Sequence, residues 1–371
     1  MTRLILLSIL FLLSLLIIFR APTNLSWYVS ILVTEFCWVF IVLIAFLLFI
    51  RFGAARFYLP ANLIGIVSIV IYLLPIIQAY RVAADVKKNL PDAFPTKMED
   101  EAPFNPFQMI TGIGAKKVPY TTLTYDSAKS LTLDFYGSQV EGKRPCIVVI
   151  HGGSWAAGDS KQLPELNSEM AKWGYHVASI NYRLAPANKY PAPIEDVSAA
   201  IAYLKGQSST LNIDTSNFVL VGRSAGGQIA LTAGYLLTKK MIKGVVCFYG
   251  PADMIWGYQN PTNPLVLDSR KIMEDYLGGS LSDVREQYVQ SSATEMVNNE
   301  TPPLLLIFGQ NDPLVSDGHG LRLSKKLKPL NVNYYELYLP WATHAFDYTL
   351  NGPGGQLSTW ATKHFITSVT Q

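Results

Sequence analysis

The chain has few cysteines, few charges and no run of basic residues, and each shortage narrows the possible functions. Only three cysteines occur among 371 residues, and Cys37, Cys146 and Cys247 lie far apart within apolar segments. Cysteines scattered in this way are typically small buried side chains. Their spacing fits neither a disulfide framework nor a C-x-x-C metal site. Charged residues make up 15% of the chain and the net charge is +3. We therefore expect no nucleic-acid partner.

Apolar residues, in contrast, are abundant, and their excess lies in the first eighty positions. Three apolar segments stand out there, at residues 4–19, 27–50 and 57–77. As helices they would be about 24, 36 and 31 Å long, against a hydrocarbon core of about 30 Å. We predict a membrane anchor of three transmembrane helices over residues 1–80. A signal peptide is the alternative for the first segment, but no small-residue cleavage site follows it.

Glu35 is the one ionisable residue deep within the second segment. A carboxylate in hydrocarbon is costly unless it is neutral or paired. We interpret Glu35 as protonated and hydrogen-bonded to a neighbouring span, with a functional site as the alternative. The flanking Lys and Arg residues are too evenly divided to decide the orientation. Arg3 and the free amino group favour a cytoplasmic amino end, which would put the rest of the chain on the extracytoplasmic side.

Residues 81–117 lose the apolar character and contain several prolines, so we predict a linker. From 118 to 371, short strand-like runs alternate with helix-length amphipathic segments. This alternation predicts a mostly parallel eight-stranded sheet with helices on both faces and an antiparallel hairpin at one edge. Strands are expected at 119–125, 131–136, 146–150, 176–182, 218–221, 244–249, 304–308 and 334–339, and helices at 164–173, 194–205, 225–237, 320–327 and 356–367.

The most informative motif is Gly222-Arg223-Ser224-Ala225-Gly226-Gly227, which joins an expected strand to an expected helix. A serine at such a sharp turn is strained, and small residues two positions away on either side make the turn possible. The turn raises the hydroxyl above the sheet and points the amino end of the helix at the same place, where negative charge is favoured. Ser224 is therefore the candidate nucleophile.

A serine nucleophile needs a base and an oxyanion hole. His151-Gly152-Gly153-Ser154-Trp155 follows a strand, and its two glycines let backbone N–H groups approach a substrate oxygen. We predict that the amides of Gly152, Gly153 and Ala225 form the oxyanion hole, while His151 has a structural role. The candidate bases are His176, His319, His344 and His364.

The position of each histidine decides among the candidates. His344 lies in a loop just after a strand, where an open α/β sheet gathers its site. Asp312 lies on the equivalent loop one strand earlier, and Asp317 is the alternative acid, with helix capping as its other interpretation. The chain order Ser224, Asp312, His344 is the one expected of α/β-hydrolases.

At this point the chain from about residue 117 to the end resembles an α/β-hydrolase of the hormone-sensitive-lipase and feruloyl-esterase-like carboxylesterase group. The resemblance implies hydrolysis of carboxylic esters without metal or cofactor. It also implies that Tyr182, Arg183 and Asp196 are scaffold beneath the oxyanion loop. The matching segments are His151-Gly152-Gly153-Ser154-Trp155, Asn181-Tyr182-Arg183-Leu184-Ala185-Pro186, Tyr190-Pro191-Ala192-Pro193-Ile194-Glu195-Asp196 and Gly222-Arg223-Ser224-Ala225-Gly226-Gly227, completed by Asp312 and His344.

Two departures from the group's usual pattern bear on the substrate. Ser154 stands where lipase-type members carry a third glycine, and Arg223 stands where many relatives have an acidic residue. Arg223 either favours an anionic part of the substrate or binds surface carbonyls, and we favour the second interpretation. Residues 251–301 are too long for a plain connection, so we predict a lid-like insertion that shapes the acyl pocket. The candidate substrate-binding residues are Ser154, Trp155, Arg223 and Trp256.

These observations predict a membrane-anchored serine hydrolase that acts on small-molecule or lipid esters through an acyl-enzyme. An amidase, a peptidase or an acyltransferase could use the same triad. A non-catalytic membrane sensor with a hydrolase-like domain is a further alternative, against which the intact triad and oxyanion motif argue. The sequence leaves the acyl length, the membrane side and the oligomeric state open.

Overall fold

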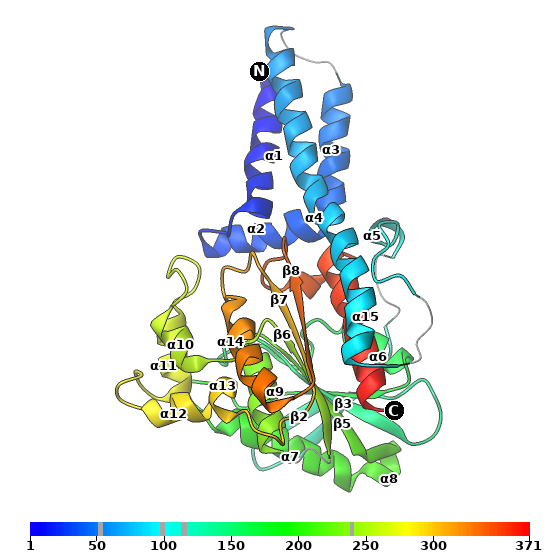
Figure 1. Cartoon of the computed structure of the whole chain (residues 1–371), viewed down its shortest axis with the longest axis vertical. Coiled ribbons are helices and arrows are strands. Elements are labelled where there is room, and N and C mark those ends of the chain that lie inside the picture. Colours follow the sequence, from blue (N-terminus) through cyan, green and yellow to red (C-terminus); the bar gives the residue numbers. More distant parts are fainter. Residues whose placement is uncertain (51–54, 97–100, 113–116, 238–240) are drawn as a thin grey trace.

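The computed structural model describes residues 1–50, 55–96, 101–112, 117–237 and 241–371. It has two visibly different parts, an elongated group of helices at the amino end and an α/β part that holds the sheet (Figure 1). The helices of the first part are α1 (Thr2–Ile18), α2 (Asn24–Glu35), α3 (Cys37–Phe49), the short 3-10 helix η1 (Ala55–Phe57) and α4 (Tyr58–Ala93).

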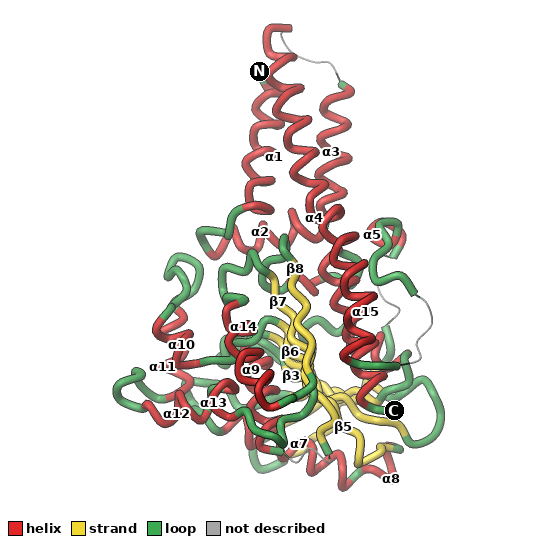
Figure 2. The backbone as a smooth tube through the Cα atoms, viewed as in Figure 1, coloured by secondary structure: helices red, strands yellow, loops and turns green. Residues whose placement is uncertain are grey.

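The α/β part is built on one sheet, whose strands are yellow in Figure 2. The sheet has eight strands in the order β1-β2-β4-β3-β5-β6-β7-β8. The strand β2 is antiparallel to both β1 and β4, and all other neighbours are parallel. The predictions of a mostly parallel sheet and of an edge hairpin are confirmed. The strands are β1 (Tyr120–Asp126), β2 (Leu131–Tyr136), β3 (Arg144–Ile150), β4 (His176–Ile180), β5 (Ile213–Arg223), β6 (Ile242–Phe248), β7 (Leu304–Gly309) and β8 (Tyr334–Leu339).

The central strands are apolar because helices cover them. Every residue of β7 is buried, as expected for a parallel strand that has a neighbour on each side in a covered sheet. Helix α9 packs on β5 and β6, α15 packs on β6 and β7, and α6 packs on β4. The helices of this part are α5 (Gln108–Thr111), α6 (Glu165–Lys172), α7 (Ala192–Gly206), α8 (Ser208–Leu211), α9 (Ala225–Leu236), α10 (Met254–Gln259), α11 (Ser269–Leu277), α12 (Arg285–Gln290), α13 (Ala293–Met296), α14 (Gly318–Leu327), η2 (Lys328–Leu330), η3 (Phe346–Tyr348) and α15 (Pro353–Val369).

Helices α1, α3 and the first half of α4 form a bundle, and α2 lies across its base beside the α/β part (Figure 1). Arg3 is buried inside the bundle, where its Nε donates to Leu47 O at 2.7 Å and its Nη2 donates to Asn62 Oδ1 at 2.6 Å. A Cβ on Gly65 would lie 2.8 Å from Leu48 Cδ2, so this glycine allows α3 and α4 to approach closely. The bundle is thus a packed unit, and the charged side chain of Arg3 inside it is hydrogen-bonded.

The prediction of three separate transmembrane helices is wrong. Among the described residues, one helical stretch, Ala55–Ala93, is long and apolar enough to cross a membrane. Helices α2 and α3 would count as a second only as a pair, and they are bent by 80° at their junction. Helix α1 is 17 residues long. The predicted second span breaks because its polar residues turn away from the bundle and bond to the α/β part.

Glu35 shows this most clearly, because its partner is not a neighbouring span. Its Oε2 accepts a hydrogen bond of 2.9 Å from the backbone N–H of Gly354, in the first turn of α15. Burial raises the pKa of Glu35 to about 8, more than the hydrogen bonds from the Gly354 and Gly355 N–H groups lower it, which favours the protonated side chain that we predicted. A Cβ on Gly352 would lie 2.2 Å from the same oxygen, so this glycine leaves room for the carboxylate. Glu35 therefore joins the amino-terminal helices to the α/β part.

The predicted linker also begins too early, because α4 continues to Ala93. The fall in hydrophobicity after residue 80 marks a change of surroundings and not the end of the helix. One face of this extension stays buried, with Ala83, Val86 and Leu90 packed where α4 contacts β8 and α15. The rest of the predicted linker includes residues 97–100 and 113–116, which lie outside the described residues.

Candidate active site

Ser224 sits at the turn between β5 and α9 with φ 51° and ψ −120°. A non-glycine residue with positive φ is strained, at a cost of about 1–3 kcal/mol. Both flanking glycines are required sterically. A Cβ on Gly222 would lie 2.1 Å from Gly226 O, and a Cβ on Gly226 would lie 2.2 Å from Ile150 O. The sharp turn predicted from the motif is therefore present in the structure.

His344 and Asp312 converge on this serine from neighbouring strand ends. His344 Nε2 lies 3.0 Å from Ser224 Oγ, and His344 Nδ1 lies 2.6 Å from Asp312 Oδ2. Asp312 follows β7 and His344 follows β8. Because a carboxylate only accepts hydrogen bonds, Nδ1 carries the proton and the lone pair of Nε2 faces the serine.

Further contacts fix the orientation of the acid and the imidazole. The other carboxylate oxygen of Asp312 accepts backbone N–H groups of Leu314 at 2.7 Å and Val315 at 2.9 Å. The imidazole of His344 packs against Tyr249, with ring centroids 4.4 Å apart. Its backbone carbonyl accepts the indole N–H of Trp27 from α2 at 3.1 Å. The amino-terminal helices therefore contact a residue of the site directly.

The other histidines and the alternative acid have different partners. The Asp317 carboxylate pairs with Arg20 at 3.6 Å. His319 is buried beside Trp256, accepts the Asp253 backbone N–H at Nδ1, and burial lowers its pKa to about 4. His176 Nε2 lies 3.1 Å from Asn212 O, and His364 Nε2 lies 2.8 Å from Phe94 O.

One of the three N–H groups that we predicted for the oxyanion hole already donates to a side chain in the structure. The N–H of Gly152 donates to Gln162 Oε1 at 2.7 Å, so a side chain already occupies it. Within the described part of the chain, the N–H groups of Gly153, Ser154 and Ala225 donate no hydrogen bond to other protein atoms. Gly153 has φ +121° and a Cβ there would lie 2.0 Å from Ala157 O, so this position requires glycine.

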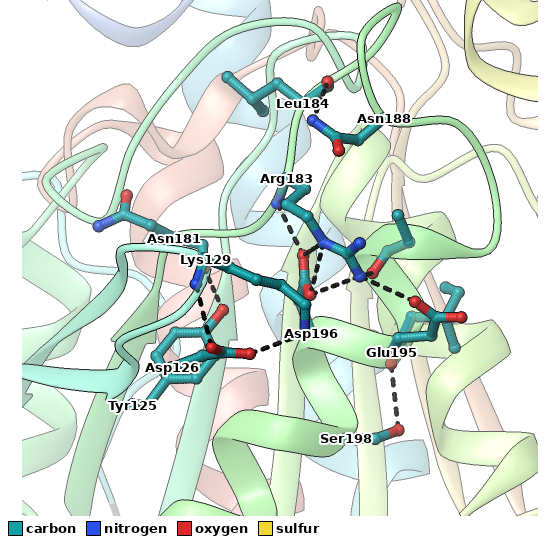
Figure 3. A network of polar contacts seen from close by, with 12 residues as sticks. Tyr125, Asp126, Lys129, Asn181, Arg183, Leu184, Asn188, Glu195, Asp196 and Ser198 are labelled. Carbon is teal, nitrogen blue, oxygen red and sulfur yellow. Dashed lines mark hydrogen bonds and ion pairs between the residues drawn. The ribbon is translucent and has the colours of Figure 1, made fainter.

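A polar scaffold supports the loop from below. His151 stacks on Tyr182, with centroids 4.3 Å apart, and the Tyr182 hydroxyl donates to His151 O at 3.1 Å. Burial lowers the pKa of His151. Arg183 binds the fully buried Asp196 through Nε at 2.9 Å, and the Arg183 backbone N–H donates to the same carboxylate at 2.8 Å (Figure 3). Both oxygens of the Asp196 carboxylate are thus bonded to Arg183.

Arg223 fits neither of its two predicted interpretations. It is buried, and its Nε donates to Asp347 Oδ2 at 2.5 Å, while the Tyr249 hydroxyl donates to the other oxygen of that carboxylate. Burial alone would lower the pKa of Arg223, but the charge of Asp347 outweighs it and the pKa is raised. Burial and the same carboxylate raise the pKa of Tyr249. The cation beside the nucleophile is therefore neutralised within the protein.

Two cavities meet at Ser224. The larger, of about 840 Å³, is lined by Gly153, Arg223 and His344 together with part of α2. The smaller, of about 580 Å³, is lined by Asp312, His319 and residues of the 251–301 segment, including Trp256. Both are lined by Ser154, Ser224, Leu267, Ile272 and Leu314.

The predicted substrate-binding residues divide between these cavities. Ser154 borders both, Trp256 borders the smaller one, and Arg223 borders the larger one as a buried ion pair. Trp155 borders the smaller cavity but is 5% exposed, stacks on Tyr276 with centroids 4.5 Å apart and donates to Gln228 Oε1 at 2.9 Å. Trp155 therefore supports the wall.

The contribution of the amino-terminal part to both cavities was not predicted from the sequence. Arg20, Ala21 and Pro22 line the smaller cavity. Five residues of α2 line the larger one, namely Asn24, Trp27, Tyr28, Ile31 and Leu32. A signal was present, because Ser26, Ser30, Thr34 and Glu35 are polar residues spaced along an otherwise apolar stretch.

Comparison with known proteins identifies the family. The family described as BD-FAE matches residues 133–327, just over half of the chain. The probable carboxylic ester hydrolase LipM of Mycobacterium tuberculosis is 28% identical over 223 residues, covering 56% of this chain and 50% of LipM. Esterase LipQ of the same organism is 28% identical over 229 residues, covering 56% of this chain and 51% of LipQ. The chain thus spans about half the length of these curated relatives.

Solved structures give the same fold. A hyperthermophilic esterase from the archaeon Pyrobaculum calidifontis aligns with a TM-score of 0.59 at 19% identity, covering 78% of this chain and 93% of that one. A bacterial heroin esterase aligns with a TM-score of 0.59 at 20% identity, covering 69% of this chain and 84% of the other. These similarities concern the fold, whereas the family match concerns the sequence. The chain belongs to the BD-FAE family and has the fold of α/β-hydrolase esterases.

Proposed function

We propose that the protein is a serine hydrolase that cleaves carboxylic esters through an acyl-enzyme on Ser224. The observation that carries this proposal is the hydrogen-bonded chain of 3.0 Å from Ser224 Oγ to His344 Nε2 and 2.6 Å from His344 Nδ1 to Asp312 Oδ2. The two Mycobacterium tuberculosis relatives, whose names describe ester hydrolysis, support the choice of ester as substrate.

In the first half of the reaction, His344 Nε2 takes the proton of Ser224 as Oγ attacks the ester carbonyl carbon. The carbonyl oxygen becomes an oxyanion, which accepts the N–H groups of Gly153 and Ala225. Asp312 keeps the imidazole in the productive tautomer and stabilises its positive charge. His344 then protonates the leaving alcohol, and the C–O bond breaks to leave the acyl group on Ser224.

In the second half, water replaces the alcohol. His344 Nε2 removes a proton from water, the hydroxide oxygen attacks the acyl carbon, and the same amides hold the second oxyanion. The Ser224–acyl bond then breaks, the proton returns to Oγ, and the acid leaves. One backbone donor to the oxyanion is worth about 3–4 kcal/mol of transition-state stabilisation.

We also propose that the bundle of α1, α3 and the first half of α4 anchors the protein in a membrane. Large apolar side chains cover its outside, including Leu12 at 61%, Val42 at 59% and Val70 at 56% exposure. The stretch Ala55–Ala93 has the length and composition of a span. The extracytoplasmic position of the active site stays a prediction, which labelling of intact cells with a membrane-impermeant fluorophosphonate would test.

The direct test of the proposed chemistry is Ser224→Ala in the full-length protein. We expect wild type to hydrolyse p-nitrophenyl esters and to react with a fluorophosphonate, and the variant to lose both activities by at least about 10³-fold. Unchanged turnover by Ser224→Ala would refute the assignment. If wild type cleaved matched arylamides faster than esters, the protein would be an amidase and not an esterase. Transfer of the acyl group to an added alcohol in preference to water would indicate an acyltransferase.

A further inference from the structure

Helix α2 supplies one wall of the larger cavity at the catalytic serine. The α2 residues that line it are Asn24, Trp27, Tyr28, Ile31 and Leu32. They fall at positions i, i+3, i+4, i+7 and i+8, which lie on one face of a helix. Four of the five are large apolar or aromatic residues. The cavity thus has a continuous, largely apolar wall that runs the length of α2.

This wall is held firmly against the site. The Trp27 indole donates to His344 O at 3.1 Å, and the Ser30 hydroxyl donates to Thr343 Oγ1 at 3.1 Å. At the start of the helix the Asn24 side chain donates to Val266 O at 3.1 Å, and beyond the wall Glu35 accepts the Gly354 N–H at 2.9 Å. Helix α2 is therefore bonded to the α/β part at its start, in its middle and at its end.

The rim of the cavity is apolar and open to the outside. Tyr28 is 54% exposed, Leu32 is 48% exposed, and Tyr348, which also lines the cavity, is 55% exposed. Helix α2 lies across the base of the bundle and bends by 80° into α3, whose outer residues Val42 and Phe46 are 59% and 58% exposed (Figure 1). The rim of the cavity therefore lies at the level where the apolar bundle ends.

Tyrosine and tryptophan at this level are what a membrane interface favours, because their rings sit among lipid headgroups. With the bundle in hydrocarbon, α2 would lie along the interface. The larger cavity would then open toward the acyl chains. The smaller cavity has a mixed lining, in which Asn260, Thr262 and Ser316 stand among apolar residues, so it offers hydrogen-bonding groups to a polar part of a substrate.

We infer that the substrate is a membrane-resident ester with a long aliphatic chain, drawn into the larger cavity along α2. This inference rests on the proposed hydrolase function and specifies its substrate class. The aliphatic chain lies against Tyr28, Ile31 and Leu32, the ester carbonyl lies at Ser224, and the polar remainder of the molecule lies in the smaller cavity. Each methylene transferred from water into an apolar pocket strengthens binding about fourfold.

The first experiment measures chain-length preference in the full-length protein in detergent. The probes are p-nitrophenyl octanoate and p-nitrophenyl butyrate, and the readout is the ratio of their kcat/KM values. We expect wild type to prefer octanoate by at least about tenfold. This is less than the gain that the four additional methylene groups of octanoate would give if each left water completely. Leu32→Trp extends a bulky ring from the rim into the cavity, and we expect it to reduce the ratio about tenfold.

Leu25→Trp is the matched control. Leu25 is on the same helix and 75% exposed, but it does not line the cavity. We expect this variant to keep both the wild-type ratio and the wild-type turnover. An equal ratio in wild type, Leu32→Trp and Leu25→Trp would overturn the inference while Ser224-dependent butyrate hydrolysis kept the proposed function intact. Loss of Ser224 dependence would instead overturn both.

The second experiment distinguishes a membrane source from a soluble one. Full-length protein is placed in phosphatidylcholine nanodiscs that contain dioleoylglycerol, or in nanodiscs without it that are mixed with separate phosphatidylcholine vesicles containing dioleoylglycerol. We expect release of oleate at least about tenfold faster when protein and ester share a bilayer. Equal rates would show that the chain reaches the site through water, and would overturn the membrane route.

Discussion

The sheet core and the amino-terminal bundle are both rich in large aliphatic side chains. The sheet buries these side chains, whereas the bundle exposes many of them. Val219, Leu220 and Val221 in β5 have no exposed surface. In the bundle, Ile9 on α1 is 49% exposed, Val42 on α3 is 59% exposed and Leu63 on α4 is 56% exposed. A soluble protein rarely displays so many large apolar side chains on one unit. This difference supports the proposed membrane position of the bundle.

Helix α2 belongs to both parts. Its polar residues Ser30 and Glu35 bond to the α/β part, whereas Leu25 and Leu32 on the same helix are exposed. If the bundle lies in a membrane as proposed, the boundary between lipid and water runs along this helix, next to His344. The following predictions test the contrast, beginning with the largest expected effect.

In the α/β part, function depends on single polar atoms. Asp312→Asn keeps the shape of the side chain but replaces the acceptor of the His344 Nδ1–H. We expect kcat to fall by about 10⁴-fold, because the imidazole then adopts the wrong tautomer. Asp317→Asn is the matched control, since Asp317 is a nearby acid that pairs with Arg20. Steady-state ester hydrolysis measures both, and similar losses in the two variants would contradict the assignment of the acid.

For the bundle, the proposed membrane anchor requires an apolar exterior. Ile66→Arg puts a charge on an α4 residue that is 54% exposed, and we expect it to cost about 2.5–3.5 kcal/mol of insertion free energy. Leu321→Arg on α14 changes a residue of similar exposure, 46%, in the α/β part, where such changes stay within about 0.5 kcal/mol. The fraction of protein that resists alkaline extraction from membranes measures the difference. If the two variants were extracted to the same extent, the exterior of the bundle would be no more sensitive to charge than that of the α/β part.

At the junction, Glu35 holds the two parts together. Glu35→Ala leaves the Gly354 N–H without its partner, and we expect it to lower the free energy of unfolding by about 1–3 kcal/mol. Glu35→Gln keeps an acceptor oxygen and should lose less than Glu35→Ala. Thermal unfolding of the full-length protein in detergent compares the two. An alanine variant as stable as the glutamine variant would show that the hydrogen bond does not stabilise the junction.

The smallest expected effect concerns Gln162. Its side chain accepts the Gly152 N–H, which the motif alone predicts to serve the oxyanion. Gln162→Met removes one neutral hydrogen bond, worth about 1 kcal/mol. We expect kcat to fall by no more than about fivefold. A loss of a hundredfold or more would show that Gln162 or Gly152 participates directly in the reaction.

The sequence predicted the α/β part well because its signals are local. Buried parallel strands are short apolar runs, and β2 and β8 begin and end where their composition predicted. The motif around Ser224 constrains its own backbone through Gly222 and Gly226. Asp312 and His344 could be placed because parallel strands deliver their carboxyl-terminal loops to one edge of the sheet.

The amino-terminal helices were predicted poorly because hydrophobicity alone does not tell where a helix bends or what it touches. The break after Glu35 depends on a glycine-rich helix start more than three hundred residues away. The continuation of α4 to Ala93 depends on packing against α15. Likewise, Arg223 could not be paired with Asp347 from the sequence, since 124 positions separate them. These are tertiary contacts without a local signal.

The most direct test of the central claim is to locate the covalent adduct. Full-length protein is treated with a fluorophosphonate, digested and analysed by mass spectrometry, in parallel with Asp312→Asn. We predict one modified residue, Ser224, and a labelling rate reduced by orders of magnitude in the variant. Modification of a different residue, or ester turnover that persists after Ser224 is fully modified, would contradict the account.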